Sequence, residues 1–318
     1  MILGKFLPPH AGHQALVHFG LNFVDRLYVL VCTIEREPIS GTLRYAWMRE
    51  LFPSANVVHV DRELPQEPGD HPQFWEIWRE VVHAAVGEKI DYVFASEGYG
   101  QRLAEELDAE FVCFDVAREL VPVSGTAVRT RPLENWRYIP ECVRPHFLKR
   151  ICVFGPESTG KSTLARDFAA DFGTAYVPEF ARGWLDPKGG VCSYEDIETI
   201  ARGQLAAEDS LARRGDRVLF CDTDLLLTTI WSDELFGRCP EWITRAAAAR
   251  RYDLYLLLDV DVPWVDDTQR FLPHRRREFF ERCRDLLEEQ RRPYVVLNGT
   301  WLERFARGRR AVEALLAE

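Results

Sequence analysis

Two short segments of the chain have residue types and spacings that suit them to holding phosphate groups. They are Gly4-Lys5-Phe6-Leu7-Pro8-Pro9-His10-Ala11-Gly12-His13 near the start and Gly155-Pro156-Glu157-Ser158-Thr159-Gly160-Lys161-Ser162 near the middle. The second segment fits the template Gly-x4-Gly-Lys-Ser of loops whose backbone wraps nucleotide phosphates. The first segment brings two imidazoles close to a flexible glycine. Because each segment marks its own site, the chain is expected to hold two nucleotide sites.

The mid-chain loop is the more specific of the two signals. A strand is expected over 151–155, directly before it, and a helix over 161–172, directly after it, which is the context that such a loop requires. Lys161 would reach the β- and γ-phosphates, and Ser162 would ligate Mg²⁺. Backbone N–H groups from Glu157 to Gly160 would cradle the phosphates. The candidate nucleotide-binding residues here are Gly155, Glu157, Ser158, Thr159, Gly160, Ser162 and Thr163.

Acidic residues follow two other expected strands of this half. Residues 217–222 predict an apolar strand that runs into Asp222-Thr223-Asp224, where a carboxylate can hold the Mg²⁺ shell. The alternative is that Asp222 and Asp224 only cap the next helix. Glu179 follows a shorter strand, where small-molecule kinases with this kind of loop often grip the acceptor. The sequence therefore predicts Ser162 and Asp222 as metal ligands, and it leaves Glu179, Asp222 and Asp224 open as general base.

An arginine-rich segment follows the next expected strand. Trp264-Val265-Asp266-Asp267-Thr268-Gln269-Arg270 leads into the basic run His274-Arg275-Arg276-Arg277. Such a run is often a solvated surface. In a phosphate-loop kinase it instead resembles a lid whose Arg270 and Arg276 close on the transferring phosphate and exclude water.

The N-terminal segment predicts a second phosphate site. A strand ending at Phe6 and a helix starting near Gly12 put His10 and His13 at a helix N-terminus, which favours anions. Both imidazoles could donate hydrogen bonds to a triphosphate and stabilise departing pyrophosphate. Gly12 allows close approach of the backbone, and Lys5 could add a positive charge. The candidate binding residues of this segment are Gly4, Lys5, Phe6 and Gly12, and the alternative is an ordinary helix start that contains two histidines.

A second element supports this site. It is the segment Val121-Pro122-Val123-Ser124-Gly125-Thr126-Ala127-Val128-Arg129. This segment suggests a phosphate grip, that is, a group of phosphate-binding residues at the start of a helix, with Ser124 and Thr126 as hydroxyl donors and Arg129 on the phosphates. A plain N-capped helix is the alternative. Ile39-Ser40-Gly41-Thr42-Leu43-Arg44 looks similar but has a shorter spacing. We interpret it as a helix N-cap, with Arg44 close to the substrate as the less favoured alternative.

The elements that must position these residues alternate between strand and helix in both halves. Strands are expected over 2–6, 26–33, 56–60, 91–96 and 110–115, then over 151–155, 175–178, 217–222, 252–261 and 294–298. Helices are expected over 13–24, 43–51, 72–86 and 100–107, then over 161–172, 193–213, 277–291 and 301–316. This alternation predicts an α/β fold with parallel sheets, whose ligands bind at the carboxyl ends of the strands. Two domains are expected, over 1–148 and 149–318.

Bulk composition narrows the function class. The 318 residues are 47% hydrophobic and 28% charged, with a net charge of −10 and no long apolar run. These values predict a cytoplasmic protein without a membrane span, and they argue against a surface that coats nucleic acid. The eight cysteines are scattered with no Cys-x-x-Cys pair, which argues against a zinc site.

Taken together, the motifs resemble known families. His-x-Gly-His is the arrangement of enzymes that cleave a nucleoside triphosphate between its α- and β-phosphates. With Ser-Gly-Thr-x-x-Arg it resembles the nucleotidyltransferase superfamily, and nicotinamide mononucleotide (NMN) adenylyltransferases in particular. The order of the motifs resembles that of NadR-type bifunctional proteins, and the resemblance covers nearly the whole chain. It extends to the segments that connect the motifs, such as Asn135-Trp136-Arg137-Tyr138-Ile139-Pro140.

The resemblance implies a Rossmann-like nucleotidyltransferase followed by a P-loop kinase. The kinase would make NMN from nicotinamide riboside and ATP, and the first domain would join NMN to a second ATP, giving NAD and pyrophosphate. It also implies that Ser96 and Glu97 lie on the adenine side of the first site and that Trp75 stacks on the nicotinamide ring. The helix-turn-helix domain of some family members would find no room before residue 4, which argues against DNA binding.

Two rival functions remain open at this level. One is a coenzyme A synthase-like enzyme, which also joins a nucleotidyltransferase to a P-loop kinase; Thr126 and the aromatic 74–78 segment favour nicotinamide instead. The other is a nucleotide-sensing regulator with weak catalysis, against which the complete set of motif residues argues. The sequence does not decide between a monomer and a homo-oligomer.

Overall fold

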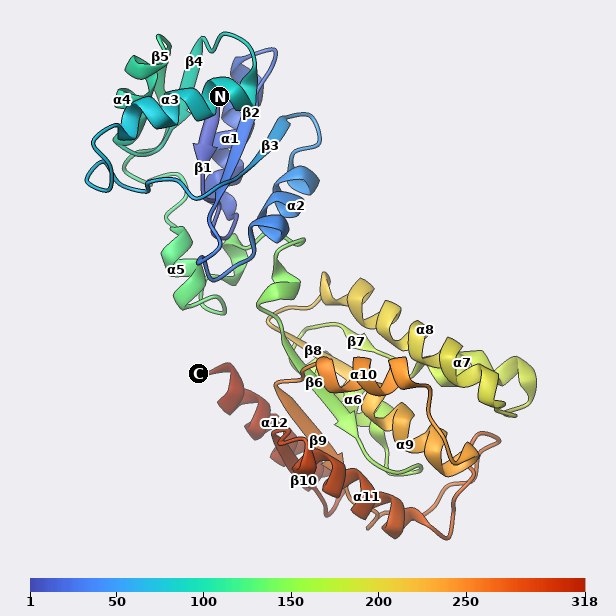
Figure 1. Ribbon diagram of the computed structural model, residues 1–318. Coiled ribbons are helices and arrows are strands. Elements are labelled where there is room, and N and C mark those ends of the chain that lie inside the picture. Colours follow the sequence, from blue (N-terminus) through green and yellow to red (C-terminus); the bar gives the residue numbers. More distant parts are fainter. Residues whose placement is uncertain (318) are drawn as a thin grey trace. The chain divides into compact units, whose positions relative to one another are not determined.

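The computed structural model describes residues 1–317, which form two compact units, Met1–Val143 and a second unit that begins at Arg144 (Figure 1). Both units alternate strands and helices, and both contain parallel sheets, as predicted. Among the described helices, none combines the length and the apolar character that crossing a membrane requires.

The first unit begins with five strand–helix pairs. Its elements are β1 (Ile2–Gly4), α1 (Ala11–Phe23), β2 (Tyr28–Thr33), α2 (Gly41–Leu51), β3 (Asn56–Asp61), α3 (Phe74–Val86), β4 (Tyr92–Ala95), α4 (Tyr99–Glu106), β5 (Glu110–Cys113), α5 (Gly125–Thr130) and the short 3-10 helix η1 (Trp136–Tyr138). Strands β1, β2 and β3 pair in parallel, as do β4 and β5. The Met1 amino group donates to the Tyr92 carbonyl at 2.5 Å, and the Phe94 N–H donates to the Met1 carbonyl at 2.9 Å. The spatial order is therefore β3-β2-β1-β4-β5.

Helices cover both faces of this arrangement because successive side chains of a strand point to opposite sides. Val29 and Val31 of β2 belong to a core with residues of α1 and α2. Leu30 and Cys32, their neighbours in sequence, belong to a separate core with residues of α3 and α4. From the boundary between β1 and β4, the chain continues outward through β2 and β3 on one side and through β5 on the other. Open α/β sheets bind ligands at such a boundary, outside the carboxyl ends of the strands. The loops after β1 and β4 therefore border one crevice.

The second unit is built around one five-stranded parallel sheet of order β10-β9-β6-β8-β7. Its elements are the 3-10 helix η2 (Arg144–His146), β6 (Lys149–Phe154), α6 (Lys161–Asp171), β7 (Tyr176–Val177), α7 (Phe180–Leu185), the 3-10 helix η3 (Asp186–Lys188), α8 (Tyr194–Ala212), β8 (Val218–Asp222), α9 (Leu225–Phe236), α10 (Glu241–Ala249), β9 (Leu254–Leu258), α11 (Arg276–Glu289), β10 (Tyr294–Leu297) and α12 (Trp301–Leu316). Residues 151–154 of β6 and the whole of β9 are buried on both faces, and they are apolar apart from the Tyr255 hydroxyl.

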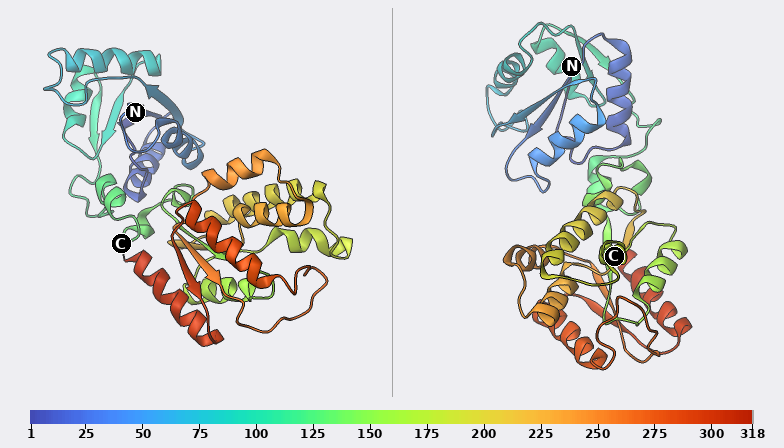
Figure 2. Two further views of the ribbon diagram at one scale, coloured as in Figure 1. Left: turned by 60° about the horizontal axis from the view of Figure 1, so that its bottom comes forward. Right: turned by 90° about the vertical axis from the view of Figure 1, so that its right-hand side faces the viewer.

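Two groups of helices flank this sheet (Figure 2). Helices α6 and α12 share one core, in which Phe168 stacks on Phe305 with ring centroids 5.0 Å apart. Helix α9 packs against α8, α10 and α11. It buries Leu225, Leu226 and Leu227 in succession, so its first turn is apolar on all sides. A turn of that kind lies inside a protein rather than on its surface.

Most expected elements are present, with differences at their ends. The first strand stops at Gly4 rather than Phe6, and Phe6 has a φ of 46°, which lies outside the extended region of a regular strand. Helices α7 and α10 were not predicted, and α9 was foreseen only as a helix after Asp224. Helix α7 is six residues long, and α9 begins with a turn that is apolar on all sides, so neither shows the amphipathic period that marks a surface helix.

Candidate functional sites

A cavity of about 810 Å³ lies in the first unit at the carboxyl ends of β1 and β4. It brings together every residue that the sequence proposed for this site. They are Gly4, Lys5, Phe6, His10, Gly12, His13, Trp75, Ser96, Glu97, Ser124, Thr126 and Arg129. These residues come from four separate stretches of chain, so the parallel topology converges them as the motif interpretation requires.

The two histidines form a stacked pair where α1 begins. His10 is the N-cap residue, and its Nδ1 accepts a hydrogen bond of 3.1 Å from the Gly12 N–H. The ring centroids of His10 and His13 lie 3.7 Å apart. Burial, with a smaller effect of Arg118, lowers the pKa of His10 to about 4. Burial, His10 and Arg118 lower the pKa of His13 well below its ordinary value.

Both rings are therefore neutral near pH 7, and this fixes how they can act. Because Nδ1 of His10 accepts, its proton must sit on Nε2, where it can be donated. Nδ1 of His13 is buried and has no hydrogen-bond partner among residues 1–317. Neutral rings still donate hydrogen bonds, and an incoming triphosphate would raise both pKa values by its negative charge.

The second phosphate element is physically tied to the first loop. Arg129 donates one Nη1 hydrogen bond to the Leu7 carbonyl, and its Nη2 donates to Thr126 Oγ1 at 3.1 Å. Ser124 caps α5 by accepting from the Ala127 N–H at 3.1 Å. The cap uses an oxygen lone pair and leaves the hydroxyl proton free to donate. The capped-helix and phosphate-grip interpretations of this segment are thus compatible.

Two basic residues near this loop have a carboxylate partner that the sequence did not indicate. The half-exposed Lys5 ammonium lies 3.5 Å from Glu37 Oε1, so its charge already has a partner. Arg44 is completely buried and donates to the Ile39 carbonyl at 3.1 Å, to the Lys5 carbonyl at 2.6 Å and to Glu37. It does not line the cavity, so the alternative that Arg44 approaches the substrate is wrong. Its guanidinium instead anchors the backbone at Lys5.

On the far side of the crevice, Trp75 is partly exposed to the cavity. Trp78, one turn further on, is buried and donates its indole N–H to the Pro65 carbonyl at 3.0 Å. Both tryptophans line the cavity, and Trp75 is the more exposed of the two. Arg118 also lines the cavity, 3.5 Å from Glu97, and sequence reasoning missed it because a single arginine in a loop has no pattern.

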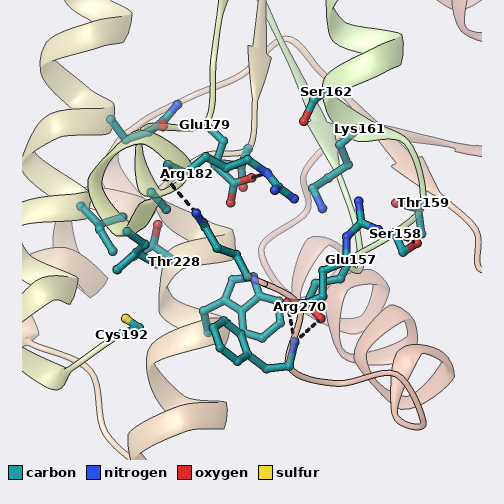
Figure 3. Close-up of a pocket in the computed structure, with 18 of the residues that line it drawn as sticks. Glu157, Ser158, Thr159, Lys161, Ser162, Glu179, Arg182, Cys192, Thr228 and Arg270 are labelled. Carbon is teal, nitrogen blue, oxygen red and sulfur yellow. Dashed lines mark hydrogen bonds and ion pairs between the residues drawn. The ribbon is translucent and has the colours of Figure 1, made fainter. Parts of the chain in front are cut away.

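A second cavity, of about 320 Å³, lies over the phosphate loop of the second unit (Figure 3). Of the predicted residues, it is lined by Glu157, Ser158, Thr159, Gly160, Lys161, Ser162, Thr163, Glu179 and Arg270. Four others do not line it, namely Gly155, Asp222, Asp224 and Arg276. Arg182, noted beside Glu179 in the sequence, lines the cavity, and so does Trp231 of the unforeseen helix α9.

The phosphate loop is shaped by two glycines and by internal hydrogen bonds. Gly155 has a φ of 133° and Gly160 a φ of 88°, both in the region that side chains disfavour. A Cβ on Gly160 would also lie 2.2 Å from the Trp301 ring. The Pro156 carbonyl accepts from Lys161 Nζ at 2.9 Å and from Thr159 Oγ1 at 2.8 Å.

Asp222, at the carboxyl end of β8, lies immediately beside this loop. Burial and the negative charge of Glu179 raise its pKa to about 6, whereas Lys161, Ser162 and Arg182 act in the opposite direction. Its Oδ1 is buried without a hydrogen-bond partner among the described residues. A buried carboxylate oxygen with no donor is an available ligand for a cation.

Asp224 has a structural role instead. Its Oδ1 accepts from the Leu227 N–H at 2.9 Å as the N-cap of α9, and its Oδ2 accepts from the Tyr255 hydroxyl at 2.8 Å. Burial raises its pKa to about 7. The interpretation of Asp224 as a general base is therefore wrong, because both of its oxygens are engaged outside the cavity. Glu179 and Asp222 remain as candidates.

The arginine-rich segment lies against the phosphate loop. Phe271 and Leu272 donate their N–H groups to the Glu157 carboxylate at 3.0 and 3.2 Å. Arg270 reaches Ser158 Oγ at 3.3 Å from its Nη1 and lines the cavity, as expected for a lid. Asp267 accepts from Arg182 at 2.8 Å and so links the lid to the opposite wall.

Arg276 is oriented differently from Arg270. Its Nη1 donates to the Val262 carbonyl and its Nη2 to the Ser158 carbonyl, both at 3.0 Å. These bonds hold the guanidinium on backbone carbonyls, and Arg276 does not line the cavity. The prediction that Arg276 contacts the transferring phosphate is therefore wrong.

The chain is similar to known proteins in its second unit and over its whole length. Residues 150–304 match the family model described as "AAA domain". The chain is 28% identical over 344 residues to the trifunctional NAD biosynthesis/regulator protein NadR of Escherichia coli (strain K12), and 28% identical over 345 residues to that of Salmonella typhimurium. Each alignment covers all of this chain and 83% of the relative.

Solved structures show the same fold. A NadR protein in complex with NR superposes with a TM-score of 0.82 at 22% identity, covering all of this chain and 96% of that one. A NadR protein in complex with NAD and AMP-PNP gives 0.80 at 22% identity, with coverage of 100% and 95%. The resemblance first drawn from two phosphate motifs is confirmed: the chain is similar to the NadR proteins over its whole length.

Proposed function

We propose that the chain is a bifunctional enzyme of NAD salvage. The second unit, a P-loop kinase, phosphorylates nicotinamide riboside with ATP to give NMN. The first unit, a Rossmann-like nucleotidyltransferase, joins NMN to the adenylyl group of a second ATP and releases pyrophosphate. The observation that carries the proposal is the presence of two phosphate loops, each at the carboxyl edge of its own parallel strands and each opening on its own cavity.

In the first unit, catalysis rests on hydrogen-bond donors placed where charge develops. His10, through Nε2–H, and Arg129 would bind the β- and γ-phosphates and stabilise pyrophosphate as it leaves. His13 would join them once the triphosphate raises its pKa. Trp75 offers an aromatic face for the nicotinamide ring, and Ser96 with Glu97 borders the adenine side. The NMN phosphate attacks the α-phosphorus directly, so no covalent enzyme intermediate is needed.

In the second unit, Lys161 and Arg270 would neutralise the transferring phosphoryl group. Mg²⁺ fits the residues present, because it takes hard oxygen ligands and keeps several sites for phosphate and water. Ser162 and the unpartnered Asp222 oxygen would hold it, and the ion would supply positive charge to the nucleotide phosphates. With Asp222 so engaged, Glu179 is the residue that would accept the proton of the riboside hydroxyl.

The proposal is supported by what the relatives' names state. The Escherichia coli and Salmonella proteins are named for NAD biosynthesis and regulation, and the solved NadR structures hold NR, NAD and AMP-PNP. The coverage of both relatives extends across the two units, so both proposed activities lie within the matched region.

A two-stage assay tests the proposal. Nicotinamide riboside with Mg-ATP is followed over time for NMN and for NAD, and dephospho-coenzyme A is offered in parallel. We expect NMN to precede NAD. Lys161→Ala should abolish NMN formation but leave the conversion of supplied NMN to NAD, whereas His13→Ala should do the reverse, so each variant is the folding control for the other. Product from dephospho-coenzyme A alone would contradict the assignment and favour a coenzyme A synthase.

A further inference from the structure

Two arginines from distant parts of the second unit donate to consecutive carbonyls of the phosphate loop. Arg276, at the start of α11, donates from Nη2 to the Ser158 carbonyl at 3.0 Å. Arg304, in the first turn of α12, donates from Nη1 to the Thr159 carbonyl at 3.1 Å. Neither residue lines the cavity, so neither can touch a nucleotide in the way that Lys161 or Arg270 can.

Holding a carbonyl fixes the N–H of the same peptide unit. The peptide is planar and trans, so its C=O and N–H point in opposite directions. A guanidinium that binds the Ser158 carbonyl on one side of the loop therefore turns the Thr159 N–H toward the opposite side. The Thr159 carbonyl and the Gly160 N–H are related in the same way. Within residues 1–317, neither of these N–H groups donates to a protein acceptor. We infer that Arg276 and Arg304 are positioning residues that aim the Thr159 and Gly160 N–H groups at the phosphates of the nucleotide.

Arg304 is well placed to impose this geometry. It is completely buried and also donates to the Gly299 carbonyl at 3.0 Å, to the Asp259 carbonyl at 3.1 Å and to Asp261. Asp261 in turn accepts from the Gly299 N–H at 2.5 Å. A planar guanidinium can serve several fixed acceptors at once, which a lysine ammonium on a flexible stem cannot do. The loop is therefore tied to the ends of β9 and β10.

The positive charges around Arg276 also favour an anion as the ligand of the phosphate loop. Burial and the positive charges of Arg304, Arg270 and Arg277 lower the pKa of Arg276, with Asp261 opposing them. Arg277 pairs with Asp259 at 2.9 Å and Arg304 pairs with Asp261, but Arg276 has no carboxylate within 4 Å among the described residues. An anion in the loop would relieve this repulsion.

The inference rests on the proposed function only in taking ATP phosphates as the ligand of this loop. Its test compares Arg276→Met, Arg304→Lys and Arg304→Met with the wild-type chain. Arg292→Met is the matched control, because Arg292 is 4% exposed and also donates to backbone carbonyls, those of Ala247, Ala248 and Arg250, in the same unit. Thermal unfolding measures the stability lost by each variant. Calorimetry measures the dissociation constants of Mg-AMP-PNP and of nicotinamide riboside.

We expect Arg304→Met to weaken AMP-PNP binding about 10- to 100-fold, since a bond from a charged donor is lost and a peptide unit is freed. Arg276→Met should weaken it about tenfold, and Arg304→Lys should fall between Arg304→Met and wild type. Riboside affinity should be unchanged in all of them, and Arg292→Met should bind AMP-PNP normally even if it melts lower. The same pattern should appear as a raised KM for ATP with an unchanged KM for the riboside.

Two outcomes would overturn the inference. One is unchanged AMP-PNP affinity in folded Arg276→Met and Arg304→Lys chains. The other is a loss in Arg292→Met equal to that in the Arg304 variants, which would show a general effect of destabilisation. If the wild-type chain binds AMP-PNP but phosphorylates no riboside, the proposed function fails, and the AMP-PNP comparison still decides the positioning role.

Discussion

His10 should weaken the fold of the first unit as the pH falls, and replacing it with asparagine should remove that weakness. His10 caps α1 through Nδ1, which accepts from the Gly12 N–H. An asparagine Oδ1 can accept the same bond, and asparagine is a preferred N-cap residue. His10→Asn thus keeps the cap while deleting the titrating group, so it isolates the cost of burying an imidazole.

The size and sign of the effect follow from the pKa of His10. Burial lowers it from 6.5 in the unfolded chain to about 4 in the folded one. Above pH 6.5 both states are neutral and His10 adds no pH dependence. Below pH 6.5 the unfolded chain binds a proton that the folded chain refuses, so stability falls with pH until about pH 4. At about 1.4 kcal/mol per pKa unit, the full loss is about 3 kcal/mol.

Two measurements check this reasoning on the whole chain without nucleotide. An NMR titration of the imidazole Cε1–H signals, with His10→Asn identifying the missing resonance, should give a midpoint near 4 for His10. Urea unfolding at pH 7.5 and 4.5 should show the variant losing less stability than wild type between the two values. A His10 midpoint near 6.5, or equal losses in both chains, would refute the account of a buried neutral ring.

Three further outcomes are expected. Gly160→Ala should raise the KM for ATP about tenfold or more, because its Cβ meets the Trp301 ring and a left-handed φ costs an alanine about 1–2 kcal/mol. Steady-state kinetics measures this KM, and an unchanged value would show that the loop relaxes around the new methyl group. Tyr255→Phe should lower the free energy of unfolding by about 1–3 kcal/mol, since it leaves Asp224 Oδ2 without its donor. Kinase activity should survive it at a permissive temperature, and an intrinsic loss of kcat in folded enzyme would return Asp224 to the catalytic machinery. Chelation of Mg²⁺ should abolish phosphoryl transfer. Asp222→Asn should raise the Mg²⁺ concentration needed for half-maximal rate, and an unchanged concentration would contradict Asp222 as a ligand.

Sequence reasoning succeeded where chemistry ties spacing to backbone shape. A phosphate loop needs its glycines and its lysine at fixed intervals, so residues 155–162 could be assigned before any fold was known. The first site could be assembled in the same way, because the carboxyl ends of parallel strands meet at one edge and bring residues 10–13 and 124–129 together.

Sequence reasoning failed where the role of a residue depends on the direction of its side chain rather than on its position in the chain. Asp222 is the last residue of β8 and Asp224 lies two residues further on, and Thr223 between them has a left-handed φ of 72° that separates their environments. No pattern of residue types reveals that turn. Arg276 belongs to a basic run that is equally consistent with a lid and with a backbone anchor. Arg304 stands alone within a helix, so no motif indicates that it is buried against the phosphate loop.

The presence of both units on one polypeptide has a consequence for the supply of enzyme. Each unit buries its own core and contains a complete cavity of its own. Translation of the chain therefore delivers the two sites at a ratio of one to one, whatever the level of expression. A single change in abundance scales the amounts of both sites together.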